Sequence, residues 1–147
     1  MSVTYIHYGA DKFEKEKFKP IKNCDCWSKP FGGFWASRDG DEDGWRTWCE
    51  DQDFYPEKLE HSFIFTIKPS ANVIEIANEE DILKLPQWKP VAGSIKYCRS
   101  FYPDFEECLR KGIDAIEITN INEAYMGLYG WDCNSILIMN PDIVEVA

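Results

Sequence analysis

The segment Ser62-Phe63-Ile64-Phe65-Thr66-Ile67 decides the fold class, because its residue types alternate strongly from one position to the next. Successive side chains of a β-strand point to opposite faces of a sheet, and aromatic and β-branched residues are enriched in strands. The segment therefore predicts a strand over residues 62–67. Weaker versions of the same pattern predict strands over residues 3–8, 34–37, 72–76, 113–118, 135–139 and 143–146.

Three stretches between these strands predict short helices, over residues 45–53, 78–85 and 102–111. Asn78 is a good N-cap for the second helix, and Pro103 suits the first turn of the third. Strands outnumber helices and the order of elements is mixed. This pattern predicts an α+β fold with a split, largely antiparallel sheet and short helices.

The composition predicts one folded domain over residues 1–147. Hydrophobic residues make up 44% of the chain and aromatic residues 15%, which is enough to offset the entropy cost of folding. No apolar run approaches the ~20 residues of a membrane span, and the first residues lack the basic and apolar regions of a signal peptide. Six cysteines without a secretory signal are expected to stay reduced, so we expect a cytoplasmic protein.

The net charge is −10, from 26 acidic and 16 basic residues. Proteins bind the phosphate backbone of nucleic acids through lysines and arginines that displace counterions, so this chain is a poor candidate for such binding. The same balance disfavours attachment to an anionic membrane surface. An acidic surface usually serves solubility, but it is also what a protein that imitates DNA requires.

An acidic turn matches the sequence pattern of a calcium-binding loop. Asp39, Asp41 and Asp43 alternate before a glycine, and Glu50 follows where such a loop has its bidentate ligand. Two features count against calcium: the preceding segment predicts a strand instead of a helix, and Arg46 brings a positive charge near the metal. The favoured interpretation is an acidic turn that caps the helix after it.

One histidine and two late carboxylates are the candidates for catalysis. His7 lies in the first predicted strand close to Gly9, where the missing side chain lets a ligand approach the backbone. Glu117 interrupts an apolar strand, and Asp132 follows aromatic residues, where partial desolvation would tune an acid. Each residue also has a structural interpretation: His7 as a hydrogen-bonded, half-buried side chain, and Glu117 as a side chain that points to solvent.

Three segments carry a family resemblance. Ile6-His7-Tyr8-Gly9 looks like a first-strand motif built around His-Gly, and Gly33-Phe34-Trp35-Ala36-Ser37 is similar to a second-strand motif of glycine, aromatics and a small hydroxyl residue. Ser135-Ile136-Leu137-Ile138-Met139-Asn140-Pro141-Asp142 looks like an apolar closing strand. In this order and at this separation, the three segments resemble the ADP-ribosyltransferase superfamily, in particular its small bacterial and phage members of the histidine type.

The resemblance implies a split-sheet fold that holds NAD in a cleft. By position, His7, with Tyr8 and Gly9 beside it, takes the role of binding the adenosine ribose. Trp35 and Ser37 take the role of contacting the nicotinamide.

The resemblance also implies a catalytic carboxylate, and here the sequence departs from the family. In the family a glutamate opens the closing strand, holds the ribose hydroxyls and stabilises the oxocarbenium-like transition state. In this chain Ser135 occupies that position. Asp132, three residues earlier, is the nearest acid, and Glu117 on the preceding strand is the alternative.

Two functional hypotheses follow from these observations. The first is NAD-dependent mono-ADP-ribosylation of a protein or nucleic-acid target, as a toxin or phage effector. The second is a non-enzymatic acidic module that imitates DNA and blocks a basic partner such as a defence nuclease. The three motifs in order support the first hypothesis, which is the leading one, and the net charge of −10 and the missing glutamate support the second.

Overall fold

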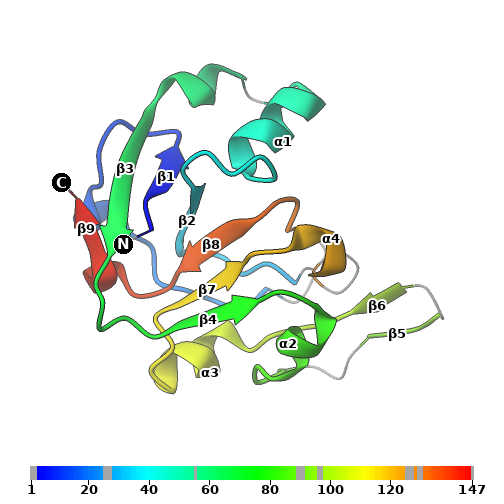
Figure 1. Ribbon diagram of the computed structural model, residues 1–147. Coiled ribbons are helices and arrows are strands. Elements are labelled where there is room, and N and C mark those ends of the chain that lie inside the picture. The colour runs from blue at the N-terminus through cyan, green and yellow to red at the C-terminus, as the bar shows by residue number, and fades with distance from the viewer. Residues whose placement is uncertain are drawn as a thin grey trace.

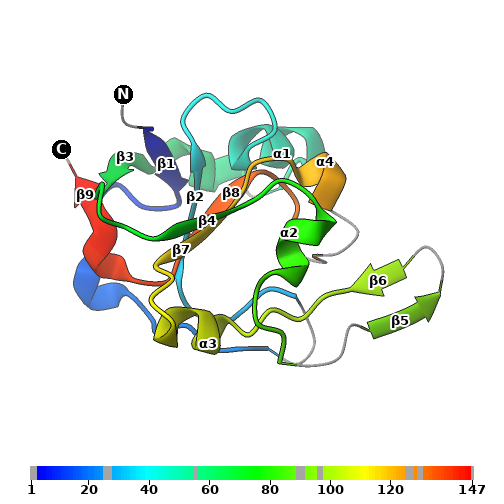
Figure 2. The ribbon, with the colours of Figure 1, turned by 60° about the horizontal axis from the view of Figure 1, so that its bottom comes forward.

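Seven strands form one sheet in the order β4-β7-β8-β2-β1-β3-β9. The computed structural model describes residues 3–24, 28–54, 56–88, 92–95, 98–124, 128 and 131–146, of which 92–95 and 98–100 are described by their backbone alone. The strands of the sheet are β1 (Tyr5–Tyr8), β2 (Phe34–Arg38), β3 (Ser62–Ile67), β4 (Val73–Ile76), β7 (Ala115–Ile118), β8 (Ser135–Ile138) and β9 (Val144–Val146). A separate two-stranded ribbon pairs β5 (Ala92–Ile95) with β6 (Cys98–Ser100) and projects from the body of the molecule (Figures 1 and 2).

The helices are short, as predicted. They are α1 (Trp45–Gln52), α2 (Glu79–Leu83), α3 (Phe105–Arg110) and α4 (Ile121–Ala124), with 3-10 turns η1 (Lys15–Lys17), η2 (Pro56–Glu60) and η3 (Pro141–Ile143). Only β4 and β7 pair in parallel; the other neighbours in the seven-stranded sheet are antiparallel. The predicted α+β class with a largely antiparallel sheet is therefore confirmed.

Local signals explain where α2 and α3 begin. The Asn78 side chain accepts a hydrogen bond from the backbone N–H of Asp81, so the predicted cap of α2 is confirmed. The expected start of α3 is wrong, because Pro103 precedes the helix. Asp104 is the N-cap instead, and its side chain accepts from the N–H of Glu107. The β5–β6 ribbon and α4 were not predicted.

The sheet is joined at its middle by a short ladder. β1 pairs with β3 over four residues, but with β2 over only two, Tyr5↔Arg38 and Ile6↔Ser37. Figure 1 shows the consequence: β1 and β3 run steeply, while β8, β7 and β4 cross below them. Beyond Ile6 the backbones of β1 and β2 are no longer paired, so the two strands separate from His7 onward.

Two hydrophobic clusters pack on the two sides of the strands. In the larger cluster, residues of β4, β7 and β8 pack with α2, α3 and α4; in Figure 2, α2 and α3 lie below the strands. The smaller cluster fills the space between β1 and β3 on one side and β2, β7 and β8 on the other. The fully buried side chains with the largest volumes include Trp131, Phe65, Phe101, Ile116, Leu137 and Met139.

Two further properties of the described residues concern the helices and the cysteines. None of the helices in the described ranges has the length and apolar character that crossing a bilayer demands. Four cysteines are buried free thiols: Cys24, Cys49, Cys108 and Cys133.

Candidate functional site

A cavity of about 260 Å³ lies where β1 and β2 separate, beside the start of β8 and the helix α1. We call it the aromatic pocket and define it by six of its lining residues: His7, Tyr8, Trp35, Trp45, Trp131 and Asp132. Four of the predicted site residues, from both ends of the chain, therefore share one concave surface. The described structure brings together His7, Tyr8, Trp35 and Asp132.

His7 sits in the gap between β1 and β2. Its Nδ1 lies 2.6 Å from the backbone carbonyl oxygen of Trp35, and a carbonyl only accepts, so Nδ1 carries the hydrogen. The ring packs against Phe34 and Phe63 at centroid distances of 4.4 and 5.3 Å. Burial lowers the pKa of His7, although the bond to Trp35 opposes the shift. The imidazole is thus held neutral, with Nε2 as an acceptor for a ligand hydroxyl.

Gly9 lies just outside the pocket and shapes the chain beyond His7. Its φ of +111° is a conformation that glycine adopts without strain, and its N–H donates to the carbonyl of His61 over 2.8 Å. Gly9 does not line the aromatic pocket.

Two tryptophans form one wall of the pocket. The rings of Trp35 and Trp131 meet at 76° with centroids 4.7 Å apart. Trp131 is buried, and its indole N–H donates to the carbonyl of Ser28 over 3.0 Å, so the hydrogen-bonding need of the ring is met within the protein. Lys29 follows Ser28, and its ammonium stands 4.8 Å from the centre of the Trp35 ring.

The helix α1 and the residue that follows its C-cap supply a second group of aromatic lining residues. Trp45 opens the helix, and Phe54 comes just after its end; their rings meet at 86° with centroids 6.0 Å apart. Trp48 stacks on Trp45 at 5.1 Å and stiffens this aromatic group. The hydroxyl of Ser37 accepts a hydrogen bond from the backbone N–H of Trp45 over 3.0 Å, which fixes the start of α1 against β2.

Ser37 therefore has a structural role in this geometry. Besides accepting from Trp45, its hydroxyl donates to the carbonyl of Asn134 over 2.8 Å, and the residue is 3% exposed. Ser37 does not line the aromatic pocket. The structure brings Trp35 to the pocket but not Ser37, its predicted partner on β2.

Asp132 is the carboxylate of the aromatic pocket. Desolvation raises its pKa above the ordinary value of 3.8, and the charge of Lys29 opposes this shift. Among the described residues no hydrogen bond to its carboxylate is found. Ser135, which opens β8, also lines the pocket, but its hydroxyl donates to the carbonyl of Cys133. Burial raises the pKa of the Cys133 thiol to about 12, so this thiol stays protonated at neutral pH.

Asn134 holds the Asp132 segment in place. Its backbone N–H donates to the carbonyl of Asp43 over 2.9 Å, and its side-chain amide donates to the carboxylate of Asp41 over 3.2 Å. Its side-chain oxygen accepts from the N–H of Ile121, at the start of α4, over 2.8 Å. The acidic turn, α4 and β2 thus all contact Asn134, two residues after Asp132.

Glu117 lies elsewhere. In the strand register Glu117 pairs with Ile136, whereas Trp35 pairs with Leu137. Neighbouring residues of β8 face opposite sides of the sheet, so Glu117 and Trp35 also lie on opposite sides. Glu117 borders two other cavities, of about 370 and 390 Å³, and not the aromatic pocket.

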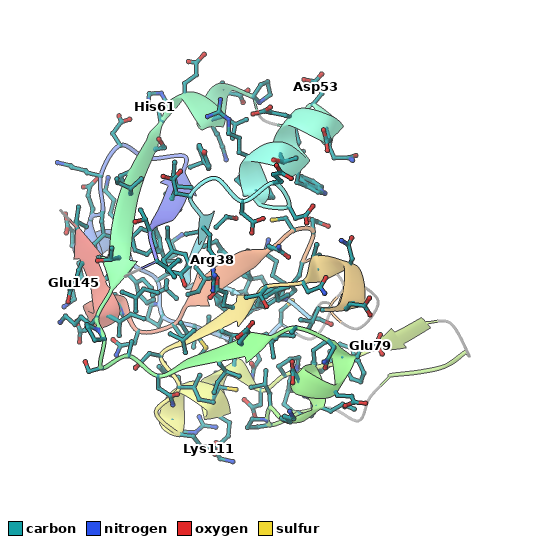
Figure 3. The ribbon with its side chains drawn as sticks, viewed as in Figure 1. Arg38, Asp53, His61, Glu79, Lys111 and Glu145 are labelled. Atoms are coloured by element: carbon teal, nitrogen blue, oxygen red, sulfur yellow. The ribbon has the colours of Figure 1, made fainter. Side chains whose placement is uncertain are left out.

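The interpretation of Glu117 as a solvent-facing side chain is wrong, because the residue is 5% exposed. Arg38 binds its carboxylate with two hydrogen bonds, Nε to Oε2 at 2.7 Å and Nη2 to Oε1 at 3.1 Å, and Tyr5 donates its hydroxyl over 3.0 Å. Burial and the charge of Glu117 raise the pKa of Tyr5, so the phenol remains the donor. Figure 3 shows Arg38 over the central strands.

The acidic turn makes hydrogen bonds and an ion pair within the protein. The carboxylate of Asp41 accepts from the N–H of Asp43 over 2.9 Å, and Glu50 pairs with Arg46 over 2.7 Å. The N-cap of α1 is Gly44, which has no side chain to bond. Within the described ranges no group of three or more histidine, cysteine or acidic side chains is arranged to hold a metal ion, and these ranges include all four predicted calcium ligands: Asp39, Asp41, Asp43 and Glu50.

No family model, curated protein or solved structure matches the chain. The features that bear on function are therefore the geometry of the aromatic pocket and the sequence motifs that contribute residues to it.

Sequence reasoning missed several residues of the pocket. Lys29 lies in a loop without any motif, and Phe54 comes just after the end of α1. Trp45 and Trp131 were visible as aromatic residues, but only the fold brings residues from such distant positions to one cavity. The signal that could have found them was the tryptophan content, since six of the 147 residues are Trp.

Proposed function

We propose that the protein is an NAD-dependent mono-ADP-ribosyltransferase that modifies a macromolecular target. The observation that carries the proposal is the meeting of His7, Trp35 and Asp132 on one aromatic pocket. The family resemblance implies the ribose role for His7 and the nicotinamide role for Trp35, and Asp132 is the acid nearest to the position where the family has its glutamate.

The size of the pocket supports binding one end of NAD. Its volume of about 260 Å³ lies just below the ~300–1,000 Å³ typical of small-molecule sites. In the proposal the nicotinamide and its ribose enter the pocket, and the remainder of the dinucleotide extends past His7. The neutral imidazole, with Nε2 as acceptor, takes a ribose hydroxyl as donor.

The chemistry is a displacement at the anomeric carbon of the ribose. The C–N glycosidic bond breaks, its electron pair goes to the ring nitrogen, and nicotinamide leaves as a neutral molecule. A nucleophile of the target forms the new bond to the anomeric carbon and loses its proton. Asp132 stabilises the positive charge that develops on the ribose, and its poorly hydrated position strengthens that interaction.

The test uses NAD labelled in its adenosine half, incubated with the protein and a cell lysate. We expect label on a macromolecule and an equal release of free nicotinamide. The matched control is Glu145→Gln, an exposed position on β9 that Figure 3 shows at the edge of the molecule. His7→Ala should lower both signals. Wild-type protein that neither cleaves NAD nor transfers label contradicts the proposal.

A second function is favoured by the serine at the start of β8. Ser135 stands where the family has its glutamate, and its hydroxyl is bonded to the backbone. A chain that has serine at this position and a net charge of −10 fits an acidic module that binds a basic protein at its DNA-binding surface. That function predicts no NAD cleavage and a salt-sensitive complex with a nucleic-acid-binding protein.

A further inference from the structure

The aromatic pocket has the composition of a cation-binding cage. Trp35 and Trp131 form one wall, Trp45 and Phe54 form another, and Asp132 supplies a carboxylate. Aromatic ring faces carry a negative potential and attract cations, and proteins use such cages to bind permanently charged nitrogen groups. A neutral ring would gain only the hydrophobic part of this interaction.

The protein already places one of its own cations in this cage. The ammonium of Lys29 lies 4.8 Å from the centre of the Trp35 ring, inside the ~6 Å range of a cation–π contact. Its backbone position is fixed, because Ser28 and Pro30 on either side are buried and Ser28 bonds to Phe101 and Trp131. Lys29 itself is exposed, so its ammonium can move into water at small cost.

We propose that the aromatic pocket selects the positively charged pyridinium ring of NAD over neutral rings, and that Lys29 is the internal cation which this ring displaces from Trp35. The inference rests on the proposed function for its choice of ligand. It adds a charge requirement and a residue that no motif in the sequence indicated.

The charge requirement has a consequence for the reaction cycle. Cleavage of the glycosidic bond returns an electron pair to the ring nitrogen, so the ring enters the pocket as a cation and is released as a neutral molecule. The neutral product loses its attraction to Trp35 and Asp132, and Lys29 regains its place over the ring. We therefore expect nicotinamide to be a weak product inhibitor.

Lys58 provides a matched control. It lines the same pocket from η2 and carries the same charge, but the lysine that lies over Trp35 is Lys29. Removing either ammonium takes one positive charge from the lining of the pocket, and the charge of Lys29 is the one that acts on Asp132. Only the removal of Lys29 also exposes the ring face that the ligand is proposed to occupy.

The first measurement compares two small probes of nearly equal shape, 1-methylnicotinamide and nicotinamide, by calorimetric or fluorescence titration of the wild-type protein. Tryptophan fluorescence suits this pocket because three of its lining residues are Trp. We expect the cationic probe to bind at least about fivefold more tightly, as a cation–π contact of ordinary strength implies. Equal affinities for the two probes would overturn the inference without the need for any variant.

The second measurement repeats the titration with Lys29→Met and Lys58→Met. Lys29→Met should raise the affinity for 1-methylnicotinamide about two- to fivefold and leave that for nicotinamide nearly unchanged. Lys58→Met should change the preference between the probes by less than twofold. An equal gain in both variants would show a general charge effect and would contradict the specific role of Lys29.

A third measurement separates this inference from the proposed function. NAD and NADH are compared as competitors of the cationic probe, alongside the NAD-cleavage assay. A preference for NAD and for 1-methylnicotinamide without any cleavage supports the cage and contradicts the transferase. Cleavage of NAD with NADH competing equally well supports the transferase and contradicts the cage.

Discussion

Two carboxylates, the buried Glu117 and the half-buried Asp132, have opposite surroundings. Glu117 is matched by the guanidinium of Arg38 and the hydroxyl of Tyr5, with three hydrogen bonds between 2.7 and 3.1 Å. Asp132 faces an aromatic cavity, and desolvation raises its pKa. A carboxylate whose oxygens are all bonded stabilises a fold, whereas one with a poorly satisfied charge is available to a ligand. We therefore expect Glu117 to contribute to stability and Asp132 to take part in the proposed reaction.

The largest effect should come from Asp132→Asn. The amide keeps the shape of the side chain but removes the charge that stabilises the ribosyl cation, so we expect the rate of NAD cleavage to fall about 10²–10³-fold. Stability should change by less than about 0.5 kcal/mol, because the described structure shows no hydrogen bond to the carboxylate. The measurement is initial-rate nicotinamide release together with urea unfolding. A variant that retains the wild-type rate would remove Asp132 from the mechanism.

Glu117→Gln should show the reverse pattern. The change breaks the bidentate pair with Arg38 and leaves its guanidinium with one partner fewer. Breaking a fully buried pair costs about 3–5 kcal/mol, but the Arg38 side chain is 44% exposed and water compensates part of the loss, so we expect about 2 kcal/mol. Urea unfolding measures this loss as a lower midpoint at unchanged slope.

The matched control for this loss is Glu75→Gln. Glu75 lies next to Glu117 in the register of β4 and β7, but it is exposed, and its change should stay within about 0.5 kcal/mol. If both variants lose the same stability, the hydrogen bonds of Glu117 are not what distinguishes the two positions.

The sequence could predict the strands of the seven-stranded sheet but not the burial of Glu117. The strand over residues 62–67 was predicted with its correct ends, because alternation is a local property that one strand displays by itself. Alternation also indicated that Glu117 faces the side opposite to its neighbours. It could not indicate that this side is covered, since the partners of Glu117 are Arg38 and Tyr5, 79 and 112 residues away.

The same limit applies to the candidate site. The motif around His7 indicated the correct strand, because a histidine followed by glycine at a strand end is visible in the sequence. The role of Ser37 was not predictable in this way: its hydroxyl is used by the backbone of Trp45 and Asn134, and those contacts exist only once α1 and β8 are assembled. The β5–β6 ribbon escaped prediction because its residues 92–95 and 98–100 show little apolar alternation and depend on pairing with each other.

A third prediction concerns the imidazole that borders the pocket. Burial lowers the pKa of His7 in the folded protein. Between this lowered pKa and about pH 6.5, the imidazole is protonated in the unfolded chain and neutral in the folded protein. The His7 contribution to stability is therefore present above pH 6.5 and is lost as the pH falls, by at most about 1.4 kcal/mol per pH unit.

The measurement for His7 is urea unfolding between pH 7.5 and pH 5 for wild type and His7→Gln. The variant should have the shallower dependence on pH, because glutamine does not titrate. His61→Gln, which replaces the other histidine of the chain, is the control. Parallel curves for wild type and His7→Gln would mean that the pKa of His7 is the same in both states.

The smallest effect should come from calcium. The turn 39–44 matches a calcium loop in sequence, yet Asp41 is bonded to Asp43 and Asn134, and Glu50 pairs with Arg46. A site with a dissociation constant of ~10 μM would add about 2.7 kcal/mol at 1 mM calcium, by linkage. We expect instead that 1 mM calcium, compared with chelator, shifts the melting temperature by less than about 1 °C. A large shift would mean that these carboxylates leave their partners for a metal. Because Asp41 also bonds Asn134, which holds the Asp132 segment, such a shift would in addition couple metal binding to the acid of the pocket.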